Sequence, residues 1–209
     1  MRILQLVTRR QRRGAEVFAI QLSDALATRG HEVIVLGLVP PSDNALSPNV
    51  ALAEDLSVHS NGRLNVRRLT QLGSAIRRIQ PDVVQANGSQ TLKYGSLAKR
   101  VLDNDFPLVY RNISIASQWV RGSAHRAWGR WLVRSLDHVT SVSEESSRDF
   151  GKVYRVPAES RSVIRRGLHI PETRPSWFTP ETTPRRRITA GCWRPFRRFG
   201  RSGPTSTWS

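Results

Sequence analysis

Short apolar runs alternate with segments of helical periodicity along the first 170 residues. The runs are rich in Val, Ile and Leu, as in strands that are buried on both faces of a parallel sheet. We expect strands at 2–7, 32–38, 82–86, 107–112, 138–142 and 161–165, with a weaker one at 49–54. Helices are expected between them at 15–29, 63–80, 89–102, 124–136 and from the N-cap Ser143 to about Gly151. This alternation predicts an α/β fold, a Rossmann-like doubly wound parallel sheet.

The chain has 209 residues, which is enough for one domain and a tail but not for a large two-domain enzyme. We expect a single domain over residues 1–171. Residues 172–209 differ in composition, because they contain five prolines, seven threonines and eight arginines, and Ile188 is their only aliphatic residue larger than alanine. Such a segment cannot bury a core, so an irregular, disordered, basic C-terminal tail is predicted.

The formal net charge of +17 favours an anionic partner, either nucleic acid or a membrane surface. Of the 33 basic residues, however, only three are lysines and 30 are arginines. A GC-rich genome produces this bias without any selection for phosphate binding. We therefore interpret nucleic-acid binding as the least favoured function.

Several features bear on the compartment and on metals. The single cysteine, Cys192, excludes an intramolecular disulfide, and no apolar stretch reaches the roughly 18 residues of a membrane span. Residues 1–13 lack the apolar region of a secretory signal, which predicts a cytoplasmic protein. The five histidines show no metal-ligand spacing, so no metal site is expected.

The connection after the first strand is where Rossmann folds bind phosphates. Here residues 12–16 read Arg-Arg-Gly-Ala-Glu, with one glycine and neither a G-x-G-x-x-G nor a P-loop motif, which excludes a tightly held dinucleotide and the P-loop nucleotidases. Other polar residues follow later strands at the same expected edge of the sheet: Ser89, Lys93, Arg111, Asn112 and Glu144. Each of them either binds a ligand or caps a helix, and the sequence leaves both readings open.

Five weak motifs occur in a consistent order. They are Gly14-Ala15-Glu16, Arg29-Gly30-His31-Glu32-Val33, the strand end from Pro81 to Gly88, Val142-Ser143-Glu144, and the segment from Val163 to Leu168. Together they resemble the N-terminal half of a retaining glycosyltransferase of family 4, which has the GT-B fold. The resemblance covers residues 1 to about 170.

The resemblance implies an enzyme that transfers a sugar from a nucleotide-sugar donor to a lipid, polysaccharide or small-molecule acceptor, without a metal. It implies that residues 1–171 are the N-terminal, acceptor-side domain of a two-domain enzyme. In this domain Gly14 approaches the donor's sugar and diphosphate, with Arg13 in place of a second glycine. The family's strand-end signature His-x-His-Gly is Gln85-Ala86-Asn87-Gly88 here, which makes Asn87 the catalytic candidate and Gly88 its neighbour. Asn87 can hydrogen-bond a sugar hydroxyl but cannot titrate near neutral pH, and such enzymes are thought to use the donor phosphate as base. The alternative interpretation of Asn87-Gly88 is a simple turn.

The chain departs from the family after residue 171. The family continues into a donor-binding domain with two glutamates eight positions apart, and no such pair occurs here. We therefore interpret the chain as truncated or frameshifted, and we expect it to be inactive by itself because half of the active-site cleft is missing.

A basic membrane-surface module without catalytic activity is the alternative function, which would place the protein at the inner membrane face. Its basis is an interfacial composition of tryptophans and arginines. The residues concerned are Trp119, Trp128 and Trp131 with Arg121, Arg126, Arg130 and Arg134. The other interpretation makes Trp128 and Trp131 core contacts of a helix.

Overall fold

The computed structural model describes residues 1–41, 44–58, 64–102, 105–120 and 122–164. The chain divides into a compact unit, Met1–Val163, and a second unit, Ile164–Ser209. The predicted domain boundary at residue 171 and the predicted disordered tail lie outside the described residues.

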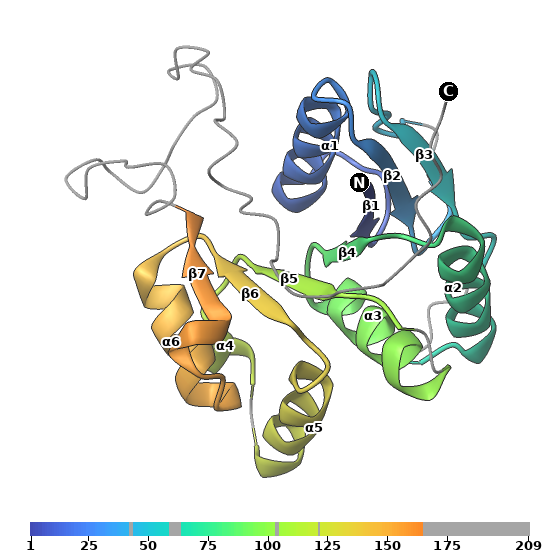
Figure 1. The fold of residues 1–209 in the computed structure, drawn as a ribbon. Helices are drawn as coiled ribbons and strands as arrows, with labels where there is room; N and C mark the ends of the chain where they lie inside the picture. Colours follow the sequence, from blue (N-terminus) through green and yellow to red (C-terminus); the bar gives the residue numbers. More distant parts are fainter. Residues whose placement is uncertain (42–43, 59–63, 103–104, 121, 165–209) are drawn as a thin grey trace, which may run out of the picture. The chain divides into compact units, whose positions relative to one another are not determined.

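The compact unit contains a seven-stranded parallel sheet in the order β3-β2-β1-β4-β5-β6-β7 (Figure 1). The strands are β1 Arg2–Val7, β2 Glu32–Gly37, β3 Leu52–Asp55, β4 Val83–Ala86, β5 Leu108–Asn112, β6 His138–Ser141 and β7 Arg161–Val163. The chain runs outward from β1 to β3 and then returns to β4 on the other side of β1. The predicted doubly wound sheet is thus confirmed, and its strand order reverses between β1 and β4.

Helices follow the strands as expected, with two short additions. They are α1 Gly14–Ala27, α2 Val66–Ile79, α3 Ser89–Val101, α4 Ala116–Trp119, α5 Ser123–Val133, α6 Glu144–Tyr154 and the 3-10 turn η1 Ala158–Ser160. The sequence did not predict α4 or η1, because four or three residues are too short to show a helical period.

Alternate residues of β1 serve two separate cores, since successive side chains of a strand point to opposite faces. Leu4 and Leu6 belong to the larger core, which also contains Leu72 of α2 and Phe150 of α6. On the other face, Val7 packs with residues of α1, namely Ala19 and Ile20, and with Val35. The helix α1 therefore covers the face of the sheet opposite to the larger core (Figure 1).

Local capping explains where two helices begin. The Ser143 hydroxyl accepts a hydrogen bond from the amide of Ser146 at 3.1 Å, which confirms the predicted N-cap of α6. The Asn65 side chain accepts from the amide of Arg68 at 3.0 Å. This cap makes α2 begin at Val66, later than the predicted residue 63. At the other end, Gln80 adopts a left-handed φ of 49° before Pro81 and stops the helix.

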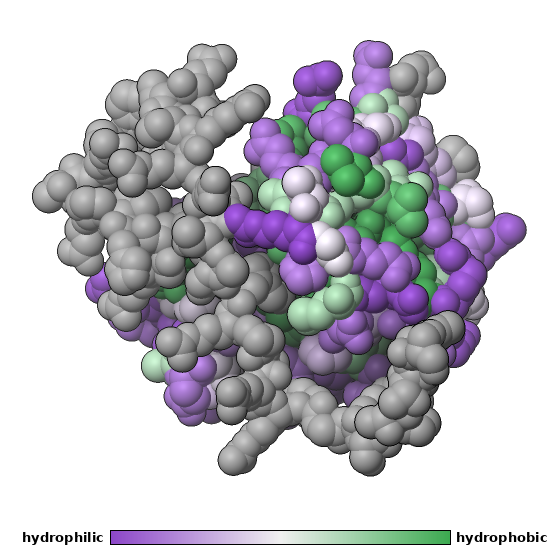
Figure 2. Space-filling view, turned by 45° about the horizontal axis from the view of Figure 1, so that its top comes forward, coloured by the Kyte–Doolittle hydropathy of each residue, from purple (hydrophilic) through white to green (hydrophobic). Residues whose placement is uncertain are grey.

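The surface of the described part is mainly hydrophilic, with hydrophobic residues showing through in places (Figure 2). Among the described helices, none combines the length and the apolar character that are needed to cross a bilayer. The largest exposed hydrophobic fractions are 70% for Trp119 and 68% for Val66.

The Asp24 carboxylate ties α1 to the loop before β3. It accepts hydrogen bonds from the amides of Asn49, Val50 and Ala51 at 2.8 to 3.1 Å. Partial burial acts to raise the pKa of Asp24, but these donors outweigh burial and hold the pKa below its usual value of 3.8.

We expect Asp24→Asn to lower the free energy of unfolding by about 1 kcal/mol at pH 7, because the amides lose a charged acceptor. A carboxyl whose pKa is lowered by folding stabilises the fold above its unfolded pKa and loses this effect as the pH falls through the folded pKa. The difference between variant and parent should therefore shrink at pH 3, as measured by urea unfolding at both pH values. Glu159→Gln, at an exposed position, is the control and should show no such convergence. An equal difference at both pH values would contradict the assignment.

Candidate functional site

The strands β1, β4, β5 and β6 end at the same edge of the sheet. The strand order reverses between two of them, β1 and β4. The amide of Asn87 donates to the Leu6 carbonyl at 3.1 Å, and the amide of Val142 donates to the Asn112 carbonyl at 3.2 Å. These bonds align the ends of β1 with β4 and of β5 with β6. Ligands of open α/β sheets bind at this carboxyl edge, beside the point where the strand order reverses.

Asn87 lies within the sheet layer and is 1% exposed. Its Nδ2 donates to Gln5 Oε1 at 2.8 Å and to the Leu6 carbonyl at 3.2 Å, and its Oδ1 accepts from Gln85 Nε2 at 3.0 Å. Both ends of the amide are therefore engaged. Direct contact between Asn87 and a sugar stays a prediction, and the buried side chain would have to become accessible for it.

Asn112 is likewise 1% exposed and joins three elements. Its Nδ2 donates to the Ser146 carbonyl of α6 at 3.1 Å and to the Ser141 hydroxyl of β6 at 3.4 Å. Its Oδ1 accepts from the amide of Ser114 at 3.4 Å. The side chain thus holds β5, β6 and α6 together at the edge, which favours the structural interpretation of Asn112 over ligand binding.

Arg111, one residue earlier, has a different environment. It is 8% exposed, and its guanidinium lies over the ring of Phe18 in α1, 3.7 Å from the centroid. Its Nε and Nη1 are buried and have no hydrogen-bond acceptor among the described residues. Burial lowers the pKa of Arg111 to about 10, so the group stays charged at neutral pH. A buried charge with unused donors costs several kcal/mol unless an anion compensates it.

Glu16, in the first turn of α1, is the carboxylate that acts on Arg111 electrostatically. It is 6% exposed, and burial raises its pKa in spite of the opposing charges of Arg13 and Arg111. No ion pair within 4.0 Å joins Glu16 to Arg111 among the described residues. Glu16 therefore moderates the positive charge of this region without using the Arg111 donors.

Small and polar residues lie at the solvent-exposed side of the carboxyl edge. Arg13, Gly14 and Ser89 are exposed, and Gly88 is half-buried. A Cβ atom built on Gly14 or Gly88 has no neighbour within 4 Å. Open space thus adjoins the first turn of α1 and the turn before α3, although Gly88 also needs glycine for its φ of 135°.

Lys93 lies apart from Arg111. It is half-buried on α3, with its Nζ 5.0 Å from the centroid of the Tyr94 ring. Burial lowers the pKa of Lys93, and the charge of Arg68 adds to this effect. Arg68 belongs to α2, on the face of the larger core. The structure therefore groups Lys93 with α2 and α3, and groups Arg111 with α1.

Glu144 is half-buried in the first turn of α6, where a carboxylate stabilises the helix dipole. It follows β6 at the carboxyl edge, as predicted. Its role in ligand binding stays a prediction.

A salt bridge holds the loop between β1 and α1. Arg10 Nε donates to the two carboxylate oxygens of Asp55, at the end of β3, at 3.1 and 2.9 Å, and its Nη2 also contacts this carboxylate. Each side chain is only 12% exposed. Arg10 Nη1 donates to the Leu46 carbonyl and the Ser47 hydroxyl at 3.3 and 3.2 Å. The loop that presents Arg13 and Gly14 is thereby fixed to the outer strand.

The sequence analysis missed Gln5, Glu16, Phe18 and the Arg10–Asp55 pair as parts of this site. A signal existed for Gln5, since a glutamine inside an apolar parallel strand needs a buried polar partner. Nothing in the sequence paired Arg10 with Asp55, because 45 residues separate them.

Two other predictions concern regions outside this edge. Trp131 packs against the larger core and stacks on Trp128 at 5.2 Å, while Trp119 and Trp128 are 70% and 42% exposed. Contact with a membrane or with nucleic acid stays a prediction. Within the described ranges, no three His, Cys, Asp or Glu side chains gather as metal ligands, and the metal-free site also stays a prediction.

Comparison with solved structures finds the same fold in glycosyltransferases. Anabaena HepE, solved in complex with UDP-glucose, superposes with a TM-score of 0.60 at 20% identity, over 78% of this chain and 43% of HepE. A glycosyltransferase from Rickettsia africae gives 0.57 at 12% identity, over 78% and 42%. The lipopolysaccharide outer core galactosyltransferase WaaB, in its apo form, gives 0.56 at 12% identity, over 78% and 45%. The chain thus spans less than half the length of these proteins.

No curated protein matches the sequence. The family model Glycosyltransferase Family 4, in contrast, matches residues 12–170, which includes the predicted site residues from Arg13 to Glu144. With the predicted motifs in order and the GT-B-like sheet confirmed, this chain belongs to Glycosyltransferase Family 4.

Proposed function

We propose that this chain takes part in the transfer of a sugar from a nucleotide-sugar donor to a lipid, polysaccharide or small-molecule acceptor, and that its carboxyl edge faces the donor's sugar and diphosphate. The observation that carries the proposal is the buried guanidinium of Arg111, with two donors unused beside the first turns of α1. Membership of the family supports the reaction class. HepE, which shares the fold, was solved with UDP and glucose and with UDP-glucose.

The contacts of each residue at the carboxyl edge indicate its role in binding the donor. Arg111 supplies the charge that a diphosphate oxygen compensates, since charge-assisted hydrogen bonds from a guanidinium to phosphate are stronger than neutral ones. Arg13 adds positive charge at the solvent-exposed side of the carboxyl edge. The open space at Gly14 and Gly88 lets a ligand approach the backbone closely.

Buried polar residues fix the ends of the strands at the carboxyl edge. Asn87 and Asn112 fix the ends of β4 and β5 through bonds to β1, β6 and α6. We assign to Asn87 a positioning role for Gly88 and Ser89, which begin α3. Preorganised donors of this kind are effective because they need no rearrangement when the ligand binds.

The test is a titration of the isotope-labelled chain with UDP-glucose, followed by amide NMR shifts. We expect saturable shifts at Gly14, Gly88 and Ser89. Gly14→Leu fills the open space with a good helix former, so it should leave the unfolding temperature unchanged and weaken UDP-glucose binding at least tenfold. Ala124→Leu, which adds the same side chain to the exposed first turn of α5, is the control.

Two results would contradict the proposal. One is a set of saturable shifts confined to elements away from the carboxyl edge. The other is an unchanged affinity of the Gly14→Leu variant while it remains folded. GDP-mannose, titrated in parallel, distinguishes a preference for the nucleotide from recognition of the diphosphate alone.

A further inference from the structure

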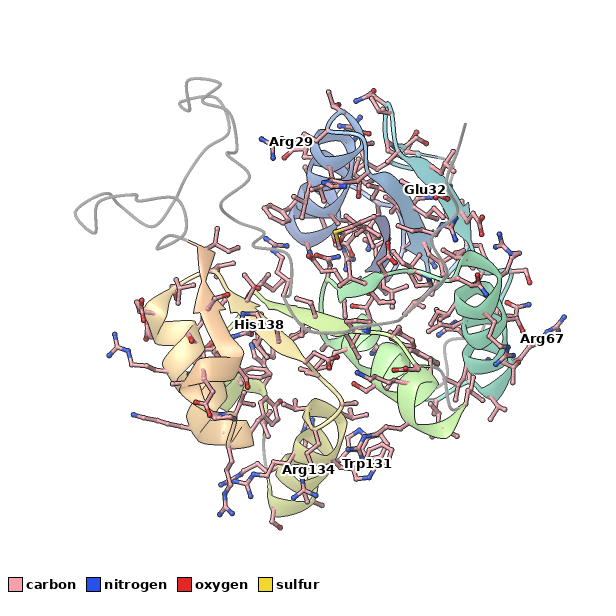
Figure 3. The ribbon with its side chains drawn as sticks, viewed as in Figure 1. Arg29, Glu32, Arg67, Trp131, Arg134 and His138 are labelled. Atoms are coloured by element: carbon pink, nitrogen blue, oxygen red, sulfur yellow. The ribbon has the colours of Figure 1, made fainter. Side chains whose placement is uncertain are left out.

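A polar cavity lies at the opposite edge of the sheet, where β6 begins. Its volume is about 200 Å³, it is open to solvent on one side, and it is lined by the C-terminal ends of α5 and α6, the start of β6 and the turn η1. Its polar lining residues are Arg130, Arg134, His138, Tyr154, Arg155 and Ser160. Figure 3 labels Arg134 after the last turn of α5 and His138 at the first position of β6. The cavity is therefore separate from the carboxyl edge described above.

The charge of this cavity is positive. Three arginines line it, and none of its lining residues is an aspartate or a glutamate. The helix ends at Arg134 and Arg155 each supply roughly half a negative charge, which offsets about one of the three positive charges. Burial lowers the pKa of His138, so this side chain is neutral at pH 7. The lining of the cavity therefore remains positively charged.

The arginines that line the cavity also have hydrogen-bond donors available for a ligand. Arg130 is half-buried and oriented by one bond from its Nε to the Val153 carbonyl, at 3.2 Å. Among the described residues, the side chains of Arg134 and Arg155 make no hydrogen bond or ion pair. Asp137, three residues after Arg134, is already bound to Lys99 Nζ and to the amide of Leu108, at 2.6 and 2.7 Å. Asp149 of α6 acts electrostatically on Tyr154, but among the described residues no carboxylate forms an ion pair within 4.0 Å with any of the three guanidinium groups.

Size and chemistry narrow the class of ligand. Pockets for drug-sized molecules usually measure about 300 to 1,000 Å³, so a cavity of about 200 Å³ suits a smaller group. Guanidinium groups bind phosphate oxygens in pairs of parallel hydrogen bonds, and the hydroxyls of Tyr154 and Ser160 add neutral donors. We propose that this cavity binds a phosphate group, either as the free ion or at the end of a phosphomonoester.

The test uses the whole chain and inorganic phosphate at constant ionic strength, followed by amide NMR shifts. We expect saturable shifts at Tyr154, Val156 and Ser160. The variant Arg134→Gln/Arg155→Gln should weaken binding at these amides at least tenfold. Arg29→Gln/Arg67→Gln removes the same charge from exposed positions on other elements, labelled in Figure 3, and should change the affinity by less than twofold.

Each outcome decides the proposal. Equal weakening of phosphate binding in both double variants would show that general electrostatics causes the effect, which would overturn the proposal. Shifts that do not saturate in the unaltered chain would also overturn the proposal. This second measurement needs no variant, so it holds even where a variant fails to fold. Glycerol 3-phosphate distinguishes the sources, because binding tighter than that of inorganic phosphate assigns a phosphomonoester and weaker binding assigns the free ion.

Discussion

Replacement of Arg111 by methionine is expected to abolish binding of UDP-glucose without any loss of stability. The two unused donors, Nε and Nη1, are available for charge-assisted bonds, each worth about 1.5 to 3 kcal/mol. Loss of both predicts an affinity at least 100-fold lower. Methionine fills a similar volume over the Phe18 ring without a charge, so the variant avoids the desolvation cost of an unpaired buried guanidinium, which is several kcal/mol per ion.

The measurements for Arg111→Met are an NMR titration with UDP-glucose and urea unfolding. Arg161→Met is the matched control, because Arg161 is half-buried but donates to the carbonyls of Pro157 and Ser147. It should lower the free energy of unfolding by about 1 kcal/mol and leave UDP-glucose binding intact. A loss of stability at Arg111 that is larger than at Arg161 would show that Arg111 is a structural residue.

The second large effect is expected from Asp55→Ala, which removes the partner of Arg10. Both side chains are only 12% exposed, so the variant leaves a largely buried guanidinium without its counter-charge. Breaking a buried pair in this way costs about 3 to 5 kcal/mol, and we expect the lower end because Leu46 and Ser47 still accept from Arg10. The unfolding free energy, measured with urea, should fall by about 3 kcal/mol.

Glu54→Ala is the control for this prediction, because Glu54 precedes Asp55 on the same strand. Its ion pair with Arg78 is exposed, with side-chain fractions of 37% for Glu54 and 60% for Arg78. Such surface pairs contribute about 0 to 1 kcal/mol. If both variants lose the same small amount, the Arg10–Asp55 pair does not hold the loop before α1, and the link to the presentation of Gly14 is lost with it.

Strands and helices were predictable wherever local chemistry specifies them. The buried runs of β1, β2 and β4 and the Ser143 cap of α6 follow the sequence closely. The exceptions are short or depend on caps, as with α4 and the start of α2 at Val66.

The candidate site was predictable only as a set of positions. Asn87, Arg111 and Asn112 all follow parallel strands, so their place at one edge of the sheet could be expected from the alternation of strands and helices. Their roles could not be expected from the sequence, since Asn112 and Arg111 are adjacent residues whose side chains have different hydrogen-bond environments. Asn112 finds acceptors in β6 and α6, whereas two donors of Arg111 find none among the described residues.

The sequence by itself determined the order of strands and helices along the chain, the class of sheet and the resemblance to the family, because periodicity, caps and motifs are properties of neighbouring residues. Only the tertiary structure decided which polar side chains keep unused donors. The reason is that their partners come from distant parts of the chain, as Asn87 and Gln5 show, which are 82 residues apart and joined by a hydrogen bond of 2.8 Å.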